Sequence, residues 1–456
     1  MKPFIRKRLP YILIAVQVIL IMGLLFYIVP GRYRLYDIVL YDASENVPAN
    51  PLTGYAPRAE LEEDCEGADL VFIMLPFSEW EPQEGVFDRE GVKEKYHIEE
   101  HRQARRHAVL RFVCDLPSKH SHRDVPDWLC SISRGVDYKD ASGKGYAPDY
   151  GDETFLKAHQ EALDALAAWC AEDSFVSYVE IGSVGQNGDW SATAESAADL
   201  IPSGQVLEQY RQQYEEAFSG DEDILLLQSG SISAALTNAD DAEGARAAGS
   251  WKDVIGDAAA TAENLSRTGA VWEKAPVGGG MTDTIPMDTL LMDNLSDTLD
   301  QIRSSHLSYI GPVCPDAEQQ QSNGSDMILR NVGYCLYLSR LQTTVDFLDD
   351  TLQIHFTFNN IGAAPMYRDW PVRMYIFNKK KCICEQTLDL RLSDLLPDKE
   401  ITVTGSVPYS RDLLNGFSVG IAITSPDGSE FITLAQKGVL PDGKGIHKVY
   451  RHKKKH

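Results

Sequence analysis

The sequence lacks the features that mark several functional classes. Its 43 Lys and Arg face 67 Asp and Glu, which gives a formal net charge of −24. Binding to the phosphates of nucleic acid needs clustered cations, so we exclude nucleic acid as a partner. None of the 8 cysteines forms a C-x-x-C pair or a Cys/His cluster with zinc-binding spacing. We therefore expect no metal site and no cofactor.

Nucleotide-binding and serine-hydrolase motifs are also missing. The stretch "VGGG" at 277–280 lacks the lysine and the strand–loop–helix context of a phosphate loop. Neither "GSVGQ" at 182–186 nor "GSISA" at 230–234 matches the G-x-S-x-G nucleophile elbow. Cys382 and Cys384 would share one face of a strand, which is poor geometry for a disulfide between them. In a chain this large we expect most of the thiols to be free and buried.

One long apolar run is present at the N-terminus. Residues 9–30 carry no charge, and four Lys and Arg precede them. About 20 apolar residues suffice to cross a bilayer as a helix, and no small-residue cleavage site follows the run. The pattern predicts an uncleaved transmembrane anchor at 10–30, with 1–9 cytoplasmic and the rest of the chain extracytoplasmic. The chain would then be a single-pass cell-membrane protein, with 31–48 as a stalk.

Residues 49–325 alternate between strand-like and helical stretches. Apolar runs at 69–77, 108–115, 174–182 and 223–230 are separated by helical segments such as 152–173. Weaker patterns predict a helix over 250–267, a strand with a glycine-rich loop at 269–280, and a last strand at 306–311. With "NPLTGYAP" (50–57) as the first strand, these repeats predict an α/β fold, a (β/α)8 barrel of the usual length.

The pattern changes after the polar stretch "QQQSNGSD" at 319–326. Short, often alternating runs separated by turn residues follow, which is typical of an all-β sandwich. The strands predicted are 343–348, 351–360, 370–378, 387–392, 400–407, 417–424 and 430–435. We place the sandwich at 326–446 and a basic tail at 447–456. The tail is either a solvated end or a contact with an anionic polymer or lipid head group.

The stretch "SEWEPQEGVFD" (78–88) follows the predicted second strand of the barrel. Pro82 and Gly85 provide turn chemistry, and Asp88 is placed to cap the next helix. In a barrel, the loops at the carboxyl ends of the strands carry the site. Trp80 is therefore a candidate for stacking on a sugar.

The pattern W-x-E-P-x-x-G-x-F-D after a strand resembles the second-strand region of retaining (β/α)8 glycoside hydrolases of the β-galactosidase and endoglycanase superfamily. Further stretches resemble a bacterial family of unknown function that pairs such a barrel with a C-terminal β-sandwich: "NPLTGYAP", "VPDWL" (125–129), 146–163, "YVEIGSVGQNGDW" (178–190), "HLSYI" and "NNIGAAPMYRDWPV" (359–372). The resemblance covers roughly 50–445 and implies a glycosidase-like barrel.

Glycoside hydrolysis needs two carboxylates, about 5–5.5 Å apart in retaining enzymes and farther apart in inverting ones. The resemblance implies an acid/base after the fourth strand and a nucleophile after the seventh. Glu180 and Asp189 are the candidates after the fourth strand. Glu180 is alternatively a buried carboxylate bonded to neighbours such as Arg111. Asp189 stands where the resembled family carries Glu, so its side chain reaches about one methylene less far.

The seventh-strand position is occupied by Gly280, where relatives tend to carry Glu. A glycine can neither attack an anomeric carbon nor stabilise its charge. Glu273 and Asp283 flank the gap. For substrate binding we select side chains expected near the barrel rim: Trp80, Arg111, Asp115, Asn187, Trp190, Trp272 and His306.

Two functions follow from these observations. The first is a glycoside-hydrolase-like protein, anchored in the membrane, that acts on a cell-surface or secreted polysaccharide through Glu180 or Asp189. The second is a catalytically inactive barrel that binds glycan in the cell envelope or in exopolysaccharide assembly. The observation behind this hypothesis is Gly280, which stands where relatives carry the nucleophile. A structural envelope protein is a third reading. Carbohydrate and the membrane are the predicted partners, and the sequence leaves the sugar, the linkage, any disulfide pairing and the oligomeric state open.

Overall fold

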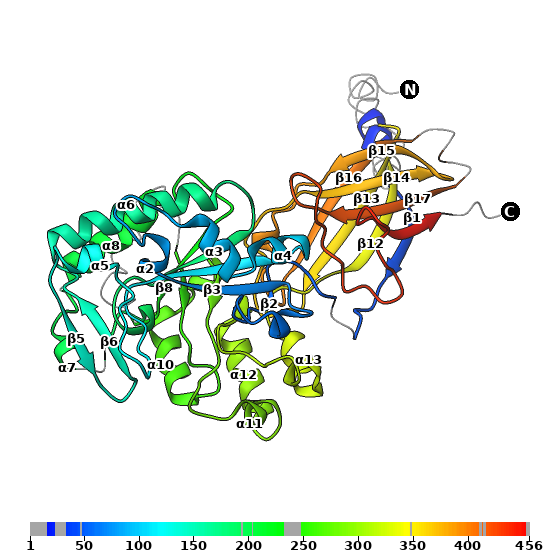
Figure 1. Cartoon of the computed structure of the whole chain (residues 1–456). Helices are drawn as coiled ribbons and strands as arrows, with labels where there is room; N and C mark the ends of the chain where they lie inside the picture. The colour runs from blue at the N-terminus through cyan, green and yellow to red at the C-terminus, as the bar shows by residue number, and fades with distance from the viewer. Residues whose placement is uncertain are drawn as a thin grey trace, which may run out of the picture.

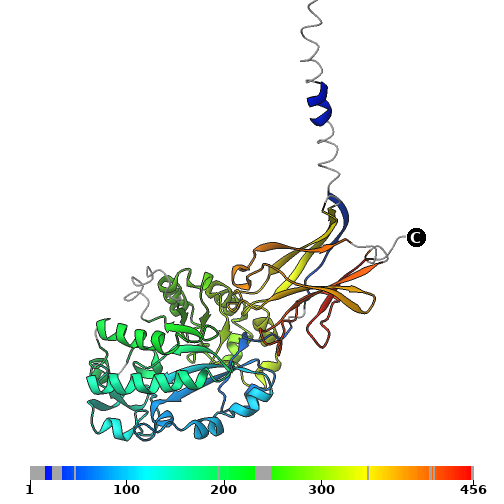
Figure 2. The ribbon, with the colours of Figure 1, turned by 90° about the horizontal axis from the view of Figure 1, so that it is seen from above.

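The fold has two parts, a barrel of parallel strands and a β-sandwich (Figure 1). The computed structural model describes residues 16–22, 33–45, 48–192, 195–202, 204–231, 248–346, 349–409, 413 and 416–452. Figure 2 shows the sandwich on one side of the barrel, with the blue strand that begins at residue 33 and the described C-terminal end of the chain both at the sandwich.

Eight parallel strands form the barrel. They are β2 (Gly54–Tyr55), β3 (Leu70–Pro76), β4 (His107–Val113), β7 (Val176–Ile181), β8 (Leu225–Ser229), β9 (Gly249–Trp251), β10 (Val277–Gly278) and β11 (Tyr309–Ile310). Six of them form one sheet in the order β10-β9-β8-β7-β4-β3, and β11 pairs with β2. Parallel bridges from Arg58 to Phe72 and from Val277 to Leu307 join these two sheets at both edges. The ring of strands therefore closes, and NPLTGYAP does contain its first strand.

Helices lie around the outside of the ring (Figure 1). They are α2 (Phe77–Trp80), α3 (Arg89–Lys95), α4 (Ile98–Gln103), α5 (Asp127–Cys130), α6 (Glu153–Cys170), α7 (Glu195–Ala198), α8 (Gly204–Ala217), α10 (Ala258–Thr268), α11 (Met287–Leu291), α12 (Leu295–Ser305) and α13 (Asn323–Leu329). A hairpin of β5 (Gly135–Lys139) and β6 (Lys144–Pro148) follows β4. The apolar spacing of 152–173 does form a helix, and Asp152 caps it by accepting from Thr154 N and Phe155 N.

Two antiparallel sheets of four strands form the sandwich. One has the order β1-β12-β13-β16, namely Tyr33–Leu40, Leu336–Asp346, Thr351–Asn360 and Glu400–Pro408. The other has the order β15-β14-β17-β18, namely Lys381–Thr387, Val372–Asn378, Phe417–Ile423 and His447–His452. Buried and part-exposed side chains alternate along β13 and β14, as an antiparallel sheet with one covered face requires.

Barrel and sandwich share one hydrophobic core. The same cluster of buried side chains contains Phe72 and Tyr309 from the barrel and Leu336 and Phe356 from the sandwich. Polar contacts reinforce the junction, because His107 Nε2 lies 3.1 Å from both Glu430 carboxylate oxygens. The sandwich is therefore packed directly against the barrel through a shared interface, and is not simply connected to it by a linker.

The structure corrects several boundaries. The predicted stalk contains β1, whose Tyr33–Leu40 pairs with β12, and the predicted basic tail contains β18, which pairs with β17. Both strands are edges of the sandwich, and edge strands are short and charged, so their sequences resemble exposed ends. Residues 453–456 of the tail lie outside the described residues.

Three secondary-structure predictions were wrong. The segment 250–267 was expected to be one helix, but β9 ends within it at Trp251 and α10 begins only at Ala258. Of the expected strands, 387–392 and 430–435 form no more than the end of β15 and one isolated bridge at Phe431. The strand β15 was missed because its lysines and cysteines give no apolar alternation.

The predicted membrane span at 10–30 lies largely outside the described residues. Residues 16–22 of that run are helical, and their apolar side chains are exposed, Leu20 by 66% for example. Within the described ranges no helix is both long and apolar enough to cross a bilayer.

The stretch 78–88 is an architectural turn. Gly85 has φ +69°, a conformation that favours glycine, and its N–H donates to Glu81 Oε1 at 2.7 Å. Asp88 accepts from Gly91 N and caps α3, as expected. Trp80 is 0% exposed, its ring stacks on those of Phe87 and Trp169, and its Nε1 donates to Ala162 O at 3.0 Å. The sugar contact expected of Trp80 is therefore wrong.

Replacing Trp80 should destabilise the fold. Trp80→Ala removes a fully buried ring and the hydrogen bond that its Nε1 donates to Ala162 O, so we expect a loss of about 3–5 kcal/mol in the free energy of unfolding. Urea denaturation followed by circular dichroism measures this. Leu440 is 82% exposed, so Leu440→Ala is the control and should change the free energy by less than about 0.5 kcal/mol. Equal denaturation midpoints for Trp80→Ala and wild type would contradict the packing described.

Candidate functional site

A cleft of about 260 Å³ opens at the mouth of the barrel. It is lined by residues in or after seven of the eight strands: Arg58, Met74, Arg111, Asn187, Asp189, Trp251, Lys252, Asp253, Met281, Asp283, Pro312 and Val313. This is the carboxyl end of the strands, where (β/α)8 proteins carry their sites. We take this cleft as the candidate site.

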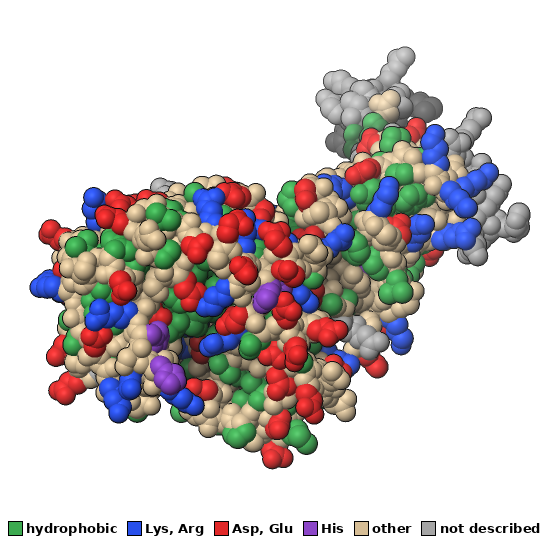
Figure 3. All heavy atoms as spheres, viewed as in Figure 1, with side chains coloured by type: hydrophobic (Ala, Val, Ile, Leu, Met, Phe, Trp, Pro, Cys, Tyr) green, Lys and Arg blue, Asp and Glu red, His purple; other side chains and the backbone are tan. Residues whose placement is uncertain are grey.

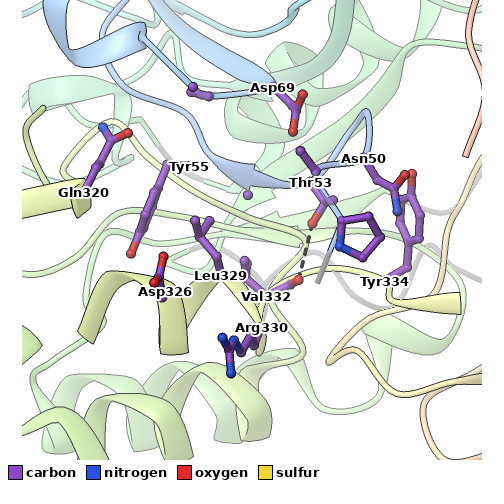
Figure 4. Close-up of a pocket in the computed structure, with 15 residues that line it drawn as sticks. Asn50, Thr53, Tyr55, Asp69, Gln320, Asp326, Leu329, Arg330, Val332 and Tyr334 are labelled. Carbon is purple, nitrogen blue, oxygen red and sulfur yellow. Dashed lines mark hydrogen bonds between the residues drawn. The ribbon is translucent and has the colours of Figure 1, made fainter. Parts of the chain in front are cut away.

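Another pocket, of about 270 Å³, lies at the opposite end of the barrel beside α13. Figure 4 shows Asp69 on one wall, with Asp326 and Arg330 on the other. Its residues come from β2 and from the segments that precede β2, β3 and β12. Residues at the amino ends of barrel strands serve stability rather than chemistry, so this pocket is not the candidate site.

Arg111, on β4, is the centre of the mouth. Its side chain is 1% exposed, and its Nε donates to Glu180 Oε2 at 2.5 Å. Its terminal nitrogens donate to Asp253 Oδ2 at 3.1 and 3.2 Å, and its guanidinium carbon lies 3.6 Å from the centre of the Trp251 ring. Burial alone lowers the pKa of Arg111, but the charges of Asp253 and Glu180 raise it above its usual value. Arg111 is therefore a fixed cation.

Glu180 is held beneath the cleft, not in it. It is 0% exposed and is not among the residues that line the cleft. Its second oxygen, Oε1, accepts from Tyr309 OH at 2.6 Å. Burial raises the pKa of Glu180 to about 7 against the opposing charge of Arg111. That value suits acid/base chemistry, but both oxygens are already bonded and face protein groups. The geometry thus favours the buried structural reading over the catalytic one.

Asp189 lines the cleft but is tied to a cation. Lys252 Nζ donates to Asp189 Oδ1 at 2.6 Å and to Ser231 Oγ at 2.6 Å. Ser229, at the end of β8, donates to the same Asp189 oxygen at 2.9 Å. Asp189 therefore links the loop after the fourth strand to residues of the fifth and sixth strands.

Asp253 occupies the space in front of Gly280. Gly280 N donates to Asp253 Oδ1 at 2.6 Å, while Asp253 Oδ2 accepts from Arg111. A Cβ added to Gly280 would lie 3.0 Å from Val313 N and 3.3 Å from Asp253 Oδ1. The seventh-strand carboxylate that the resemblance implies is thus replaced by one from the sixth strand, already bonded at both oxygens.

Sequence reasoning missed four charged or aromatic residues of the cleft. Arg58, Trp251, Lys252 and Asp253 all line it. The last three were hidden because 250–267 was predicted to be a helix. Trp251 directly follows "GS" and is itself followed by two charged residues, Lys252 and Asp253. Such a change from apolar to charged residues is the pattern that marks the end of a strand.

The other predicted binding residues divide into two groups. Asn187 does line the cleft, and its backbone oxygen accepts from Arg111 at 3.2 Å. Asp115 lies below the cleft, where Oδ1 accepts from Tyr138 OH at 2.7 Å and Oδ2 has no partner among the described residues. Trp190 is buried, and its Nε1 donates to Ile181 O. The expected substrate contacts of Asp115 and Trp190 are therefore not supported.

Trp272 and His306 are at the wrong end of the barrel for a mouth site. Their rings stack 3.6 Å apart, His306 Nδ1 donates to Ala363 O, and Trp272 O accepts from Tyr367 OH. Both precede the strands beside them, so they lie at the amino ends and hold the sandwich. Glu273, next to Trp272, shares that position. Asp283 follows β10 instead and lines the cleft as an exposed side chain.

Within the described residues, no group of three or more His, Cys, Asp or Glu is arranged to hold a metal ion. All the cysteines are described and unpaired. Cys382 and Cys384 are among the unpaired thiols.

No protein-family model matches the chain, and no curated protein matches it. Among solved structures it is similar to endo-glycoceramidase II from Rhodococcus sp. in its lactosyl-enzyme intermediate, with 13% identity and a TM-score of 0.43 over 82% of this chain and 100% of that one. It is also similar to a GH5_18 protein from Bifidobacterium longum subsp. infantis, with 12% identity and a TM-score of 0.42 over 61% and 74%. Similarity of this degree decides neither fold nor activity, and the closed ring of strands rests on its own pairing.

The buried carboxyl of Asp115 should make stability depend on pH. Burial raises the pKa of Asp115 to about 7, against the opposing hydrogen bond from Tyr138. The unfolded chain loses this proton near pH 4, at about 3.9, whereas the folded chain keeps it to about pH 7. The stabilisation is therefore complete below about pH 4 and is lost as the pH rises to about 7.

We expect Asp115→Asn to remove this dependence. Relative to wild type, its free energy of unfolding should rise by on the order of 3 kcal/mol between about pH 4 and about pH 7.5. Urea denaturation at both pH values measures the difference. The exposed Asp300 provides the matched control, Asp300→Asn, whose profile should stay parallel to wild type. A parallel profile for Asp115→Asn as well would show that this carboxyl ionises freely in the folded chain.

Proposed function

We propose that the chain binds a glycan at the barrel mouth and does not hydrolyse it. One observation carries the proposal: the carboxylates nearest the expected catalytic positions are already bonded to protein groups. Glu180 and Asp253 share Arg111, and Asp189 is held by Lys252. A retaining or inverting hydrolase needs one carboxyl that gives up a proton and one free to attack or to activate water.

The composition of the cleft suits a polyhydroxylated ligand. Asp189 and Asp253 offer acceptors, Arg58 and Lys252 offer donors, and Met74, Met281, Pro312 and Val313 line it with apolar surface. Sugars present hydroxyls that both donate and accept, together with apolar C–H faces, so they match such a mixed lining. The resemblance of 50–445 to glycosidase-like barrels points to the same ligand class.

Hydrolysis remains the second candidate because of Asp283. Asp189 and Asp283 both line the cleft, and they follow the fourth and seventh barrel strands. Those are the strands after which the resemblance places acid/base and nucleophile. In this alternative Asp189 must leave Lys252 on substrate binding, and Asp283→Asn abolishes turnover.

The binding proposal is tested at Arg58. Its side chain is 49% exposed and lines the cleft, and among the described residues its one ion pair is a 3.9 Å contact with Glu60, so Arg58→Ala should fold normally. Loss of a charged hydrogen bond to the ligand should raise Kd by roughly tenfold or more. The measurement is retention of a panel of defined neutral and acidic hexasaccharides, with titration calorimetry on those retained.

Arg303→Ala is the matched control, because Arg303 is an exposed barrel arginine outside the cleft. Its Kd should equal that of wild type. Each retained sugar is also assayed for reducing ends. Saturable retention without new reducing ends supports the proposal, release of reducing ends favours hydrolysis through Asp283, and retention of no sugar contradicts both.

We propose further that residues 10–30 anchor the chain in the cell membrane, with the barrel on the extracytoplasmic side. The uncharged run and the cations before it support this. The described part of the run, 16–22, is helical with exposed apolar side chains, which need an apolar environment.

Membrane fractionation tests the anchor. The full chain, expressed in bacterial cells, should stay with membranes after a carbonate wash and be released by detergent. Changing both Leu20 and Ile21 to Arg should move it to the soluble fraction, since each charge at the centre of a span costs about 2.5–3.5 kcal/mol. Leu440→Arg is the control, because Leu440 is exposed on the sandwich. A wild-type chain released by carbonate would contradict the anchor.

A further inference from the structure

Basic side chains collect at the end of the sandwich that lies away from the barrel. The pairing of Phe417 with His452, Ser418 with Phe377 and Asn378 with Lys381 puts the β14–β15 turn beside the end of β18. That turn is made of lysines. We call Lys379, Lys380, Lys381 and Arg451 the basic end, and all four are exposed.

The chain enters the sandwich at this same end. Tyr41 OH donates to Val449 O, and Tyr450 OH donates to Asp37 Oδ2. The two strands β1 and β18 therefore run in opposite directions, and the start of β1 lies toward the end of β18. The start of β1 at Tyr33 therefore lies near the basic end, and Figures 1 and 2 show both described termini on this side of the molecule.

The basic end contrasts with the rest of the molecule. Figure 3 shows blue side chains gathered at the sandwich end and many red ones over the barrel, and the chain as a whole has a charge of −24. Asp349 and Asp350 are also exposed at this end, on the turn of the other sheet. The sequence that follows β18, "KKKH", adds further basic residues.

Lys379 is an unusual residue for its position. Its φ is +56°, in the left-handed region where a two-residue hairpin turn favours Asn or Gly. A lysine there costs backbone energy, and its side chain makes none of the hydrogen bonds, ion pairs or cation–π contacts found among the described residues. A positive φ at a residue other than glycine is a place to look for a use of the side chain.

Chain length brings the basic end close to the anchor. Only Gly31 and Arg32 separate Pro30 from Tyr33, and three residue steps reach at most about 11 Å. If 10–30 spans the bilayer, the sandwich is the first folded body outside it. The cations then face the layer of lipid head groups.

We propose that the basic end docks the sandwich on anionic phospholipid head groups and so orients the barrel mouth on a protein held at the membrane. The inference rests on the proposed anchor. Exposed Lys and Arg near an anionic bilayer each improve partitioning roughly fivefold, and the effect fades beyond a Debye length. The anionic surface attracts the basic end and repels the acidic barrel. These two opposite effects would set the orientation of the molecule.

Cys382 provides the reporter for the test, because it is an exposed free thiol next to Lys381. The full chain is inserted into vesicles of phosphatidylcholine alone or vesicles rich in phosphatidylglycerol. The rate at which a large neutral maleimide labels Cys382 is then followed by peptide mass spectrometry. We expect labelling to be at least about fivefold slower in the anionic vesicles, and high salt should restore the rate.

Two triple variants with the same change in charge separate docking from net charge. Changing Lys379, Lys380 and Lys381 to Gln should abolish the protection of Cys382. Changing Lys399, Lys437 and Lys444 to Gln, which are exposed lysines elsewhere on the sandwich, should leave it in place. Equal loss in both variants would mean that only the total charge matters, which overturns the proposal.

The remaining outcomes distinguish the anchor from the docking. A chain that floats with neutral vesicles but labels equally fast in both lipids is anchored and not docked, which overturns this inference alone. A chain that fails to float with neutral vesicles disproves the anchor, and salt-sensitive protection by added anionic vesicles would then still support docking. Protection of Cys382 by soluble alginate and not by anionic vesicles would overturn the inference in favour of an acidic polymer.

Discussion

The charge of Arg111 is buried under the barrel mouth, and the residues around it are arranged to neutralise it. A buried guanidinium is stable only with paired charges and satisfied donors. Glu180 and Asp253 supply the charges, Asn187 O accepts another N–H, and the Trp251 ring lies beneath the planar group. These partners lie in or directly after the fourth and sixth strands, so one side chain on the third strand fixes the geometry of two loops.

That requirement also limits what the mouth can do. Two of its carboxylates serve Arg111 and a third serves Lys252, so acceptors are present but none of the three is available as a nucleophile. Gly280 is part of the same arrangement, since its N–H bonds to Asp253 and a side chain there would press on Val313. The position of Gly280 on the seventh strand is thus coupled to the charge pairing of Asp253 on the sixth, and the proposal of glycan binding rests on that coupling.

The far side of the barrel is a structural junction. Trp272 and His306, although aromatic and near strand ends, are used to hold the sandwich through Ala363 and Tyr367. A continuous apolar core beneath them fixes the two parts against each other. The orientation of the barrel mouth is therefore set by the sandwich. For this reason the proposed anchor, β1 and the basic end of the sandwich all affect a cleft that lies at the opposite end of the molecule.

The sequence by itself determined the α/β class, the order of barrel and sandwich, the caps at Asp88 and Asp152, and the placing of Arg111, Asn187 and Asp189 at the ends of strands. These depend on local periodicity and turn chemistry, which are contained in neighbouring residues. It also gave Arg111 as the partner of Glu180 in the structural reading.

Tertiary structure decided the rest. Three features depend on contacts between residues far apart in the chain. They are the end of the strand at which Trp272 and His306 lie, the packing of Trp80 against Trp169 and not solvent, and the filling of the space at Gly280 by Asp253. Edge strands β1 and β18 escaped prediction for the same reason, because only their partners make them strands. The periodicity of the sequence indicates which residues are buried. Which residue each of them contacts is decided only when the barrel closes and brings distant strands together.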